Sequence, residues 1–243
     1  ANGHEKYVNY PFVEVFDTVT QKTTYTNIVQ PKTIYKSVAF TLPSNPGIIY
    51  LAGEFAFCKL DTVRGVLSTV SDYGIKGDFT KATAGMMTIK GKKYMVLVGV
   101  KKLFFFDIAT EKFVDIPGVT NEFWYDGHSG GVVKNKFYIF GGNETGTDDG
   151  DVKAWVFDPN AVEGKQMVRI KDVPVPLGGP TESLVYQNKI YIVGGTSGGD
   201  FIDSIIVYDP AKKTYTARHP LPRATVNHAA VVYNDKMYIA YGY

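Results

Sequence analysis

Several features are scarce in this sequence of 243 residues, and each scarcity excludes a class of protein. Cys58 is the only cysteine, so no disulfide bond forms within the chain, and zinc ribbons and fingers, which need several thiolates, are excluded. No apolar run approaches the length of about 18 residues that indicates a membrane-spanning helix. Lys and Arg number 26 against 24 Asp and Glu, and this net charge of +2 is too small to indicate a nucleic-acid or polybasic membrane surface.

What the sequence does contain is a series of short apolar runs separated by Gly, Pro, Asn, Asp and Lys. No stretch has a convincing helical period, so the pattern predicts an all-β chain of strands and turns. One motif, a strand that ends in apolar or aromatic residues followed by Asp, recurs at spacings of 44, 46, 51 and 51 residues. Its five copies are Val15-Phe16-Asp17, Lys59-Leu60-Asp61, Phe105-Phe106-Asp107, Val156-Phe157-Asp158 and Val207-Tyr208-Asp209.

A second series of apolar strands ends in glycine and runs ahead of the first. Its members are Ile48–Gly53, Tyr94–Gly99, Phe137–Gly142, Ile190–Gly195 and Met237–Gly242. Each follows a short polar turn, such as Asn188-Lys189, and a further apolar strand precedes that turn. The repeating unit is therefore four strands in about 48 residues, which is typical of one blade of a β-propeller.

The same period predicts the number of blades. The first and the last corner Asp are four periods apart, and about one further period is shared between the two ends of the chain. The N-terminal end supplies two outer strands, around Phe12–Asp17 and Lys22–Ile28, and the C-terminal end supplies two inner strands, around His228–Tyr233 and Met237–Tyr243. We therefore expect one domain, residues 1–243, that is an all-β propeller of five blades. One of these is a composite blade in which strands from the two ends pair and close the ring.

The repeats resemble those of the kelch family. The resemblance rests on Gly141-Gly142 and Gly194-Gly195 at strand ends, on the corners Asp158-Pro159 and Asp209-Pro210, and on Leu221-Pro222-Arg223 ahead of a new strand. It is clear over residues 128–243 and degenerate before that, where the double glycine is reduced to Ala52-Gly53 and Val98-Gly99. The resemblance implies a kelch-type propeller and admits a scaffold that binds actin or another protein inside the cell.

Most of the repeated residues have a structural explanation. A double glycine lets the backbone pass close to the neighbouring blade with a positive φ. Tyr and Phe side chains fill the gap between adjacent sheets. The corner Asp is expected to accept backbone N–H bonds in a turn, and Cys58, in an apolar stretch, is expected to be a small packed side chain.

Function is expected on the variable loops at one face of the propeller. The segment 122–128 contains three consecutive aromatic residues, Phe123, Trp124 and Tyr125, followed by Asp126 and His128. Trp124 can stack on a sugar or a peptide to which Asp126 and His128 hydrogen-bond, with Arg223 and His228 as further candidate ligand-binding residues on that face. The alternative is that this loop folds over the central channel and plugs it.

Metal binding is a weaker prediction. His128 and His228 occupy equivalent repeat positions, with Thr181 between them, and either converge on a metal or pack between blades. The acidic loop at 143–151 offers Asp148, Asp149 and Asp151 as candidate ligands for calcium, which prefers several oxygen ligands. No other cofactor is predicted.

The sequence favours a non-catalytic module that binds a glycan or a protein. An enzyme acting on carbohydrates is the first alternative, with channel carboxylates drawn from Asp72, Asp126, Glu182, Asp200 and Asp203. An intracellular kelch scaffold is the second. The chain begins at Ala1 rather than Met and contains the sequon Asn143-Glu144-Thr145, and both favour a secreted protein, while a cytoplasmic location stays open.

Overall fold

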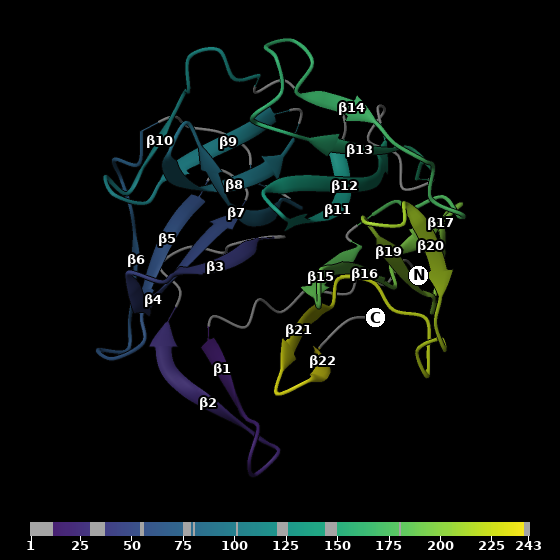
Figure 1. Cartoon of the computed structure of the whole chain (residues 1–243). Coiled ribbons are helices and arrows are strands. Elements are labelled where there is room, and N and C mark those ends of the chain that lie inside the picture. The colour runs from purple at the N-terminus through teal and green to yellow at the C-terminus, as the bar shows by residue number, and fades with distance from the viewer. Residues whose placement is uncertain are drawn as a thin grey trace, which may run out of the picture.

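The computed structural model describes residues 12–29, 37–53, 56–74, 79, 81–100, 102–120, 126–143, 150–179 and 181–240. Every regular element among them is a β-strand, and none of the described residues forms a helix able to cross a membrane. The sheets are arranged around a common centre, as the all-β propeller prediction requires (Figure 1).

Four sheets have four antiparallel strands each and are complete blades. Blade I contains β3 (Val38–Leu42), β4 (Asn45–Gly53), β5 (Ala56–Asp61) and β6 (Val66–Thr69). Blade II contains β7 (Thr83–Ile89), β8 (Lys92–Gly99), β9 (Lys102–Asp107) and β10 (Lys112–Val114). Blade III contains β11 (Asp126–Val133), β12 (Lys136–Asn143), β13 (Ala154–Phe157) and β14 (Met167–Arg169). Blade IV contains β15 (Glu182–Tyr186), β16 (Lys189–Val193), β19 (Ile205–Asp209) and β20 (Thr214–Ala217).

Three further sheets have two strands each. The N-terminal hairpin is β1 (Phe12–Asp17) with β2 (Lys22–Val29), and the C-terminal hairpin is β21 (Ala229–Tyr233) with β22 (Lys236–Ala240). A short hairpin, β17 (Thr196–Ser197) with β18 (Asp200–Phe201), is inserted between β16 and β19.

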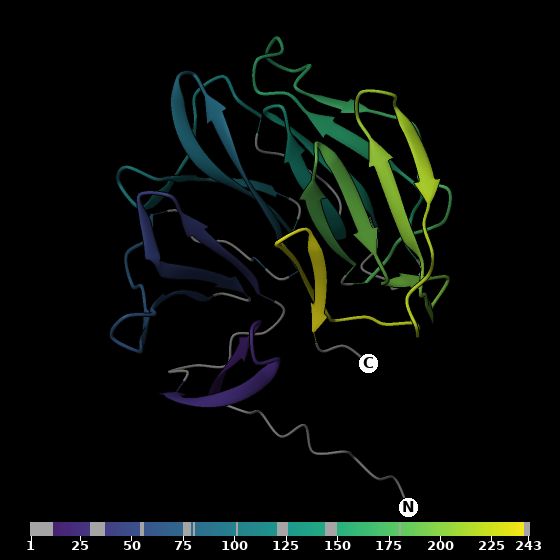
Figure 2. The ribbon, with the colours of Figure 1, turned by 60° about the horizontal axis from the view of Figure 1, so that its bottom comes forward.

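The two ends of the blades carry different connections. Because successive strands are antiparallel, the turns between first and second and between third and fourth strands all emerge at one end, which we call the turn face. The loops between second and third strands and the connections from one blade to the next emerge at the other end, which we call the loop face. Figure 2 shows the blades from a side on which their hairpin turns can be followed.

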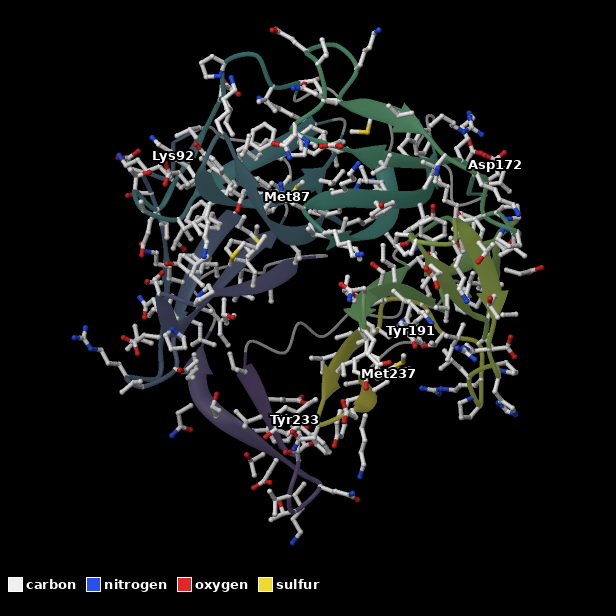
Figure 3. All side chains as sticks on the ribbon, in the orientation of Figure 1. Met87, Lys92, Asp172, Tyr191, Tyr233 and Met237 are labelled. Carbon is white, nitrogen blue, oxygen red and sulfur yellow. The ribbon has the colours of Figure 1, made fainter. Side chains whose placement is uncertain are left out.

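The hydrophobic core lies between the blades. Blades I and II enclose a cluster rich in aromatic rings, which includes Phe57, Phe106 and Phe113 with ring centroids 5.0–5.3 Å apart. Clusters of mixed aliphatic and aromatic side chains fill the contacts between blades II and III, where Met87 lies in the interior, and between blades III and IV (Figure 3). The prediction that large rings fill the gaps between sheets is confirmed, and Cys58 is fully buried as expected.

The corner aspartates form the turns that the sequence predicts. The Oδ1 atom of Asp17 accepts hydrogen bonds from the backbone N–H groups of Val19 and Thr20, at 2.8 and 3.0 Å. Asp61, Asp107, Asp158 and Asp209 repeat the bond to the residue two positions later. These bonds fix each third-to-fourth-strand turn, because the side chain replaces a backbone acceptor.

The predicted count of five blades is wrong: the described residues form four complete blades. β1 and β22, which the composite blade requires to pair, belong to separate sheets. The contact between the two terminal hairpins is a ring contact of Phe16 with Tyr238, whose centroids are 6.2 Å apart.

The reason is that each hairpin packs on a complete blade. Val13 and Ile28 of the N-terminal hairpin contact Cys58, Leu60 and Leu67 of blade I. The C-terminal hairpin is tied to blade IV, where the Tyr186 hydroxyl donates to Asp235 Oδ1 at 2.8 Å. The repeat period counts strands correctly, but it does not reveal whether the edges of two terminal hairpins meet.

Candidate functional site

The loop face is held in place by backbone contacts at the double glycines. Gly141 and Gly195 have φ values of +67° and +103°, and a β-carbon on Gly195 would lie 2.1 Å from Thr181 Oγ1. A β-carbon on Gly141 would lie 2.5 Å from the Leu177 carbonyl oxygen. These distances confirm that the double glycines allow a close approach to the connection between blades III and IV, which Gly141 meets as it leaves blade III and Gly195 meets as it enters blade IV.

Blade IV presents the best-defined part of this face. The short hairpin β17–β18 stands beside the connection 219–227, because Thr225 N–H donates to the Ile202 carbonyl at 3.2 Å and Leu221 N–H donates to that of Asp203 at 2.7 Å. Gly195 N–H donates to the Thr225 carbonyl at 2.9 Å. Two loops that are distant in sequence therefore form one rigid surface.

The surface exposes residue types that suit protein recognition. Phe201, at the end of β18, keeps half of its side chain exposed (50%), and His219 and Arg223 are exposed on the neighbouring connection. Sequence reasoning singled out Arg223 but missed Phe201. The pattern Thr-Ser-Gly-Gly-Asp-Phe was the available signal, because a Gly-Gly pair between short extended segments predicts a tight hairpin.

The two equivalent histidines are buried in contacts with the preceding blade. His128 Nε2 lies 2.9 Å from the Val98 carbonyl oxygen of blade II. His228 lies against blade IV, where a β-carbon on Gly194 would be 3.0 Å from its Cε1 atom. Burial lowers the pKa of the His228 ring below its usual value, and the Val193 carbonyl partly opposes this effect. Each ring is thus packed against a different blade, and the described residues include no group of three or more His, Cys, Asp or Glu side chains arranged for a metal.

The aromatic segment that sequence analysis favoured lies largely outside the described residues. This applies to Phe123, Trp124, Tyr125 and the side chain of Asp126, whose backbone begins β11 and pairs with Asn143. Both the binding and the channel-plugging interpretations of this segment therefore stay predictions.

The acidic loop is described only at its end. Asp148, Asp149 and the side chain of Asn143 lie outside the described residues. Asp151 pairs with Lys153, with 2.9 Å between Oδ2 and Nζ, and its Oδ1 accepts the Lys153 backbone N–H at 3.1 Å. Burial raises the pKa of the Asp151 carboxyl, but the bonds from Lys153 outweigh this and hold the pKa below its usual value. A calcium ion bound by Asp151 would have to displace Lys153.

Glu182 is distinct among the candidate channel carboxylates. It lies partly buried at the start of β15, and desolvation raises the pKa of its carboxyl to about 7, although a hydrogen bond from the Ser183 backbone opposes the shift. Asp72 is held by Lys112 at 2.8 Å, and Asp200 and Asp203 are exposed. Glycoside hydrolysis needs two carboxyl groups about 5–9 Å apart, one of which acts as an acid with a raised pKa. Among these described candidates, Glu182 is the one whose carboxyl has a raised pKa.

Comparison with known proteins agrees with this architecture. The KLHDC2/KLHL20/DRC7 Kelch-repeats domain matches residues 83–242, which run from the first strand of blade II to the end of the C-terminal hairpin. The chain belongs to the kelch-repeat family. Blade I lies outside the matched residues, yet it has the same four-stranded order as the other blades of this kelch propeller.

Two curated relatives are similar to part of this kelch chain. Kelch-like protein 6 of Homo sapiens is 28% identical over 115 residues, which are 46% of this chain and 16% of that protein. Spermatocyte protein spe-26 of Caenorhabditis elegans is 24% identical over 123 residues, 49% of this chain and 21% of that protein. The matched segment is thus about a fifth or less of each relative's length.

These findings favour one of the functional predictions made from the sequence over the others. Kelch family membership supports a protein-interaction module, which the sequence analysis gave as an alternative, and glycan binding gains no support. The names of the two relatives carry no indication of secretion, so a secreted location stays a prediction.

Proposed function

We propose that this kelch propeller is a protein-interaction module that binds a segment of a partner protein at the loop face of blade IV. Kelch family membership is the observation that carries the proposal, because propellers of this family serve as protein-binding scaffolds. We infer the chemistry of the partner from this surface and not from the names of the relatives.

The chemistry of the surface supports a protein ligand. Aromatic residues and arginine are the side chains that most often dominate binding energy at protein interfaces. Phe201 and Arg223 are both exposed and are presented by loops that backbone hydrogen bonds hold together. A preorganised surface loses little conformational entropy on binding, so these two residues are available as anchors.

Site-specific photo-crosslinking tests the proposal directly. We expect p-benzoylphenylalanine at position 201 to capture a discrete protein from extracts of the source cells. The same probe at Val168 is the matched control, because Val168 is 49% exposed, much like Phe201, but lies in the middle of β14, away from both ends of blade III. Equal capture by both probes, or none at position 201, would contradict the proposal.

Point variants then measure the contribution of each anchor. Phe201→Ala and Arg223→Glu should each weaken binding of the captured partner by about tenfold or more, as expected for interface anchors. Val168→Ala should leave the affinity unchanged. Since all three side chains are exposed, circular dichroism should show the wild-type fold in each variant.

A further inference from the structure

The turn face carries a second surface, formed by the turns between first and second strands. We define each inner turn as the two turn residues with the first two residues of the strand that follows, which gives residues 90–93, 134–137, 187–190 and 234–237 in blades II, III, IV and the C-terminal hairpin. Asn135 in the turn of blade III exchanges two hydrogen bonds with the Thr88 backbone of blade II, at 2.6 and 2.8 Å. Asp235 likewise accepts the bond from Tyr186 of blade IV. The turn of blade III is therefore fixed to the end of β7, and the turn of the C-terminal hairpin to the end of β15.

The inner turns concentrate positive charge. Asp235 is their one carboxylate, and their lysines are Lys90, Lys92, Lys93, Lys134, Lys136, Lys189 and Lys236. This excess is large for a chain whose net charge is only +2. Negative charge at the same end lies on the outer turns, at the corner aspartates.

Some of these lysines are already engaged. Lys136 pairs with Asp158 at 2.7 Å and Lys189 pairs with Asp209 at 3.9 Å, while Lys90 donates to the Pro117 carbonyl. Lys92, Lys93, Lys134 and Lys236 are exposed, and within the described part of the chain they form no ion pair. Lys92 lies at the surface of blade II, well away from the interior position of Met87 (Figure 3). Four ammonium groups are thus available to an incoming ligand.

Two of the lysines occupy a conformation that lysine disfavours. Lys90 and Lys134 each have a φ of 49°, and the residues after them, Gly91 and Asn135, also have positive φ. Two consecutive positive φ values define a tight hairpin turn in which Gly, Asn and Asp are preferred at both positions. The equivalent residues in the other two turns are Gln187 and Asn234, with φ values of 49° and 47°. Lysine at this position destabilises the turn relative to asparagine, so the stability of the turn does not account for the lysine.

We propose that the inner turns form a docking surface for an acidic segment of a partner protein. The free lysines provide complementary charge, and two of the turns that carry them are hydrogen-bonded to the neighbouring blade. Asp158, Asp209 and Asp235 are interspersed among the lysines, so a continuous phosphate backbone would meet like charges. Carboxylates spaced along an extended peptide can pass between them. This surface is at the opposite end of the blades from the loop face of the proposed function.

The test combines binding with stability in one set of variants. The probe is a fluorescein-labelled peptide of about twenty residues in which glutamate alternates with serine, at about 20 mM salt, where charge interactions are weakly screened. Lys134→Asn should weaken the affinity roughly threefold, the size expected for loss of one exposed ion pair, and should raise the melting temperature because the turn relaxes. Gln187→Asn is the matched control: it relaxes an equivalent turn without a change in charge, so the melting temperature should rise while the affinity stays the same.

Charge reversal and competing ligands decide the outcome. Lys92→Glu combined with Lys236→Glu should weaken binding about tenfold or more, whereas Phe201→Ala on the loop face should have no effect. Absence of peptide binding at low salt, or equal affinity for wild type and Lys134→Asn, would overturn the proposal. Tighter binding of a single-stranded DNA of the same length than of the peptide would also overturn it. None of these results bears on crosslinking at position 201, so the two proposals fail independently.

Discussion

The contact between blades I and II and the contact between the two terminal hairpins are built in different ways. Between the blades, Phe106 is surrounded by four aromatic rings, those of Phe40, Tyr50, Phe57 and Phe113, at centroid distances of 5.0–5.8 Å. Between the hairpins, Phe16 and Tyr238 meet at 6.2 Å, and Phe16 stays 47% exposed. The difference shows that the ring of blades is held together by face-to-face packing of the blades rather than by strand pairing between the two ends of the chain.

The largest expected effect is the loss of a ring from the dense contact. Phe106→Ala should lower the free energy of unfolding by about 3–5 kcal/mol, because it leaves a cavity among rings that cannot collapse fully. Phe16→Ala should cost only about 0.5–1 kcal/mol. Urea denaturation of the two variants measures both values, and equal losses would mean that the hairpin contact is as well packed as the blade contact.

Removal of the N-terminal hairpin should have the next largest effect. Deletion of residues 1–29 uncovers Cys58, Leu60 and Leu67, which should lower the stability by roughly 2–4 kcal/mol while blades I–IV stay folded. Thermal unfolding followed by circular dichroism gives the change. Complete unfolding at room temperature would show instead that the hairpin is needed to hold the ring.

A glycine at a close contact should matter more than a glycine at an open turn. Gly195→Ala should cost about 2 kcal/mol or more, since its φ is +103° and the new β-carbon meets Thr181. Gly198 also has a positive φ, of 58°, but no atom lies within 4 Å of the position of a β-carbon, so Gly198→Ala should cost about 1 kcal/mol. The melting temperatures of the two variants measure how much of the lost stability at Gly195 comes from the contact of the new β-carbon with Thr181. Equal losses in the two variants would show that this contact contributes nothing.

The smallest effect concerns pH at the side of blade IV that faces the C-terminal hairpin. Glu182 shares this side of β15 with Tyr186, because Ser183 faces blade III and alternate residues face opposite ways. Its pKa is raised to about 7 from 4.5, so the folded state binds the proton more tightly and stability falls as the pH rises from about 4.5 to 7.

Glu182→Gln should remove this dependence. We expect the variant to be more stable than wild type by on the order of 1 kcal/mol at about pH 8, and equally stable at about pH 4, where the wild-type side chain is protonated in both states. The difference between the two unfolding curves cancels the titration of other groups, including His228. A difference that does not change with pH would show that Glu182 is not desolvated.

The repeat itself could be predicted because its causes are local. Corner aspartates such as Asp209 bind their own turn, and the double glycine at Gly194-Gly195 meets a need of the strand end that blade IV shares with blade III. The candidate site was harder to predict from the sequence. Phe201 is exposed only because a two-residue hairpin lifts it from the sheet, and Asp151 is engaged by Lys153, which the count of acidic residues did not reveal.

The all-β class, the four-stranded unit, its period and the kelch family could all be predicted from the amino-acid sequence, since each depends on residues that repeat within about 48 positions. The number of complete blades, the docking of the terminal hairpins and the pairing of the lysines became evident in the folded molecule. Those outcomes depend on contacts between residues far apart in the chain, such as Val13 with Cys58 and Lys136 with Asp158, whose partners no local pattern specifies.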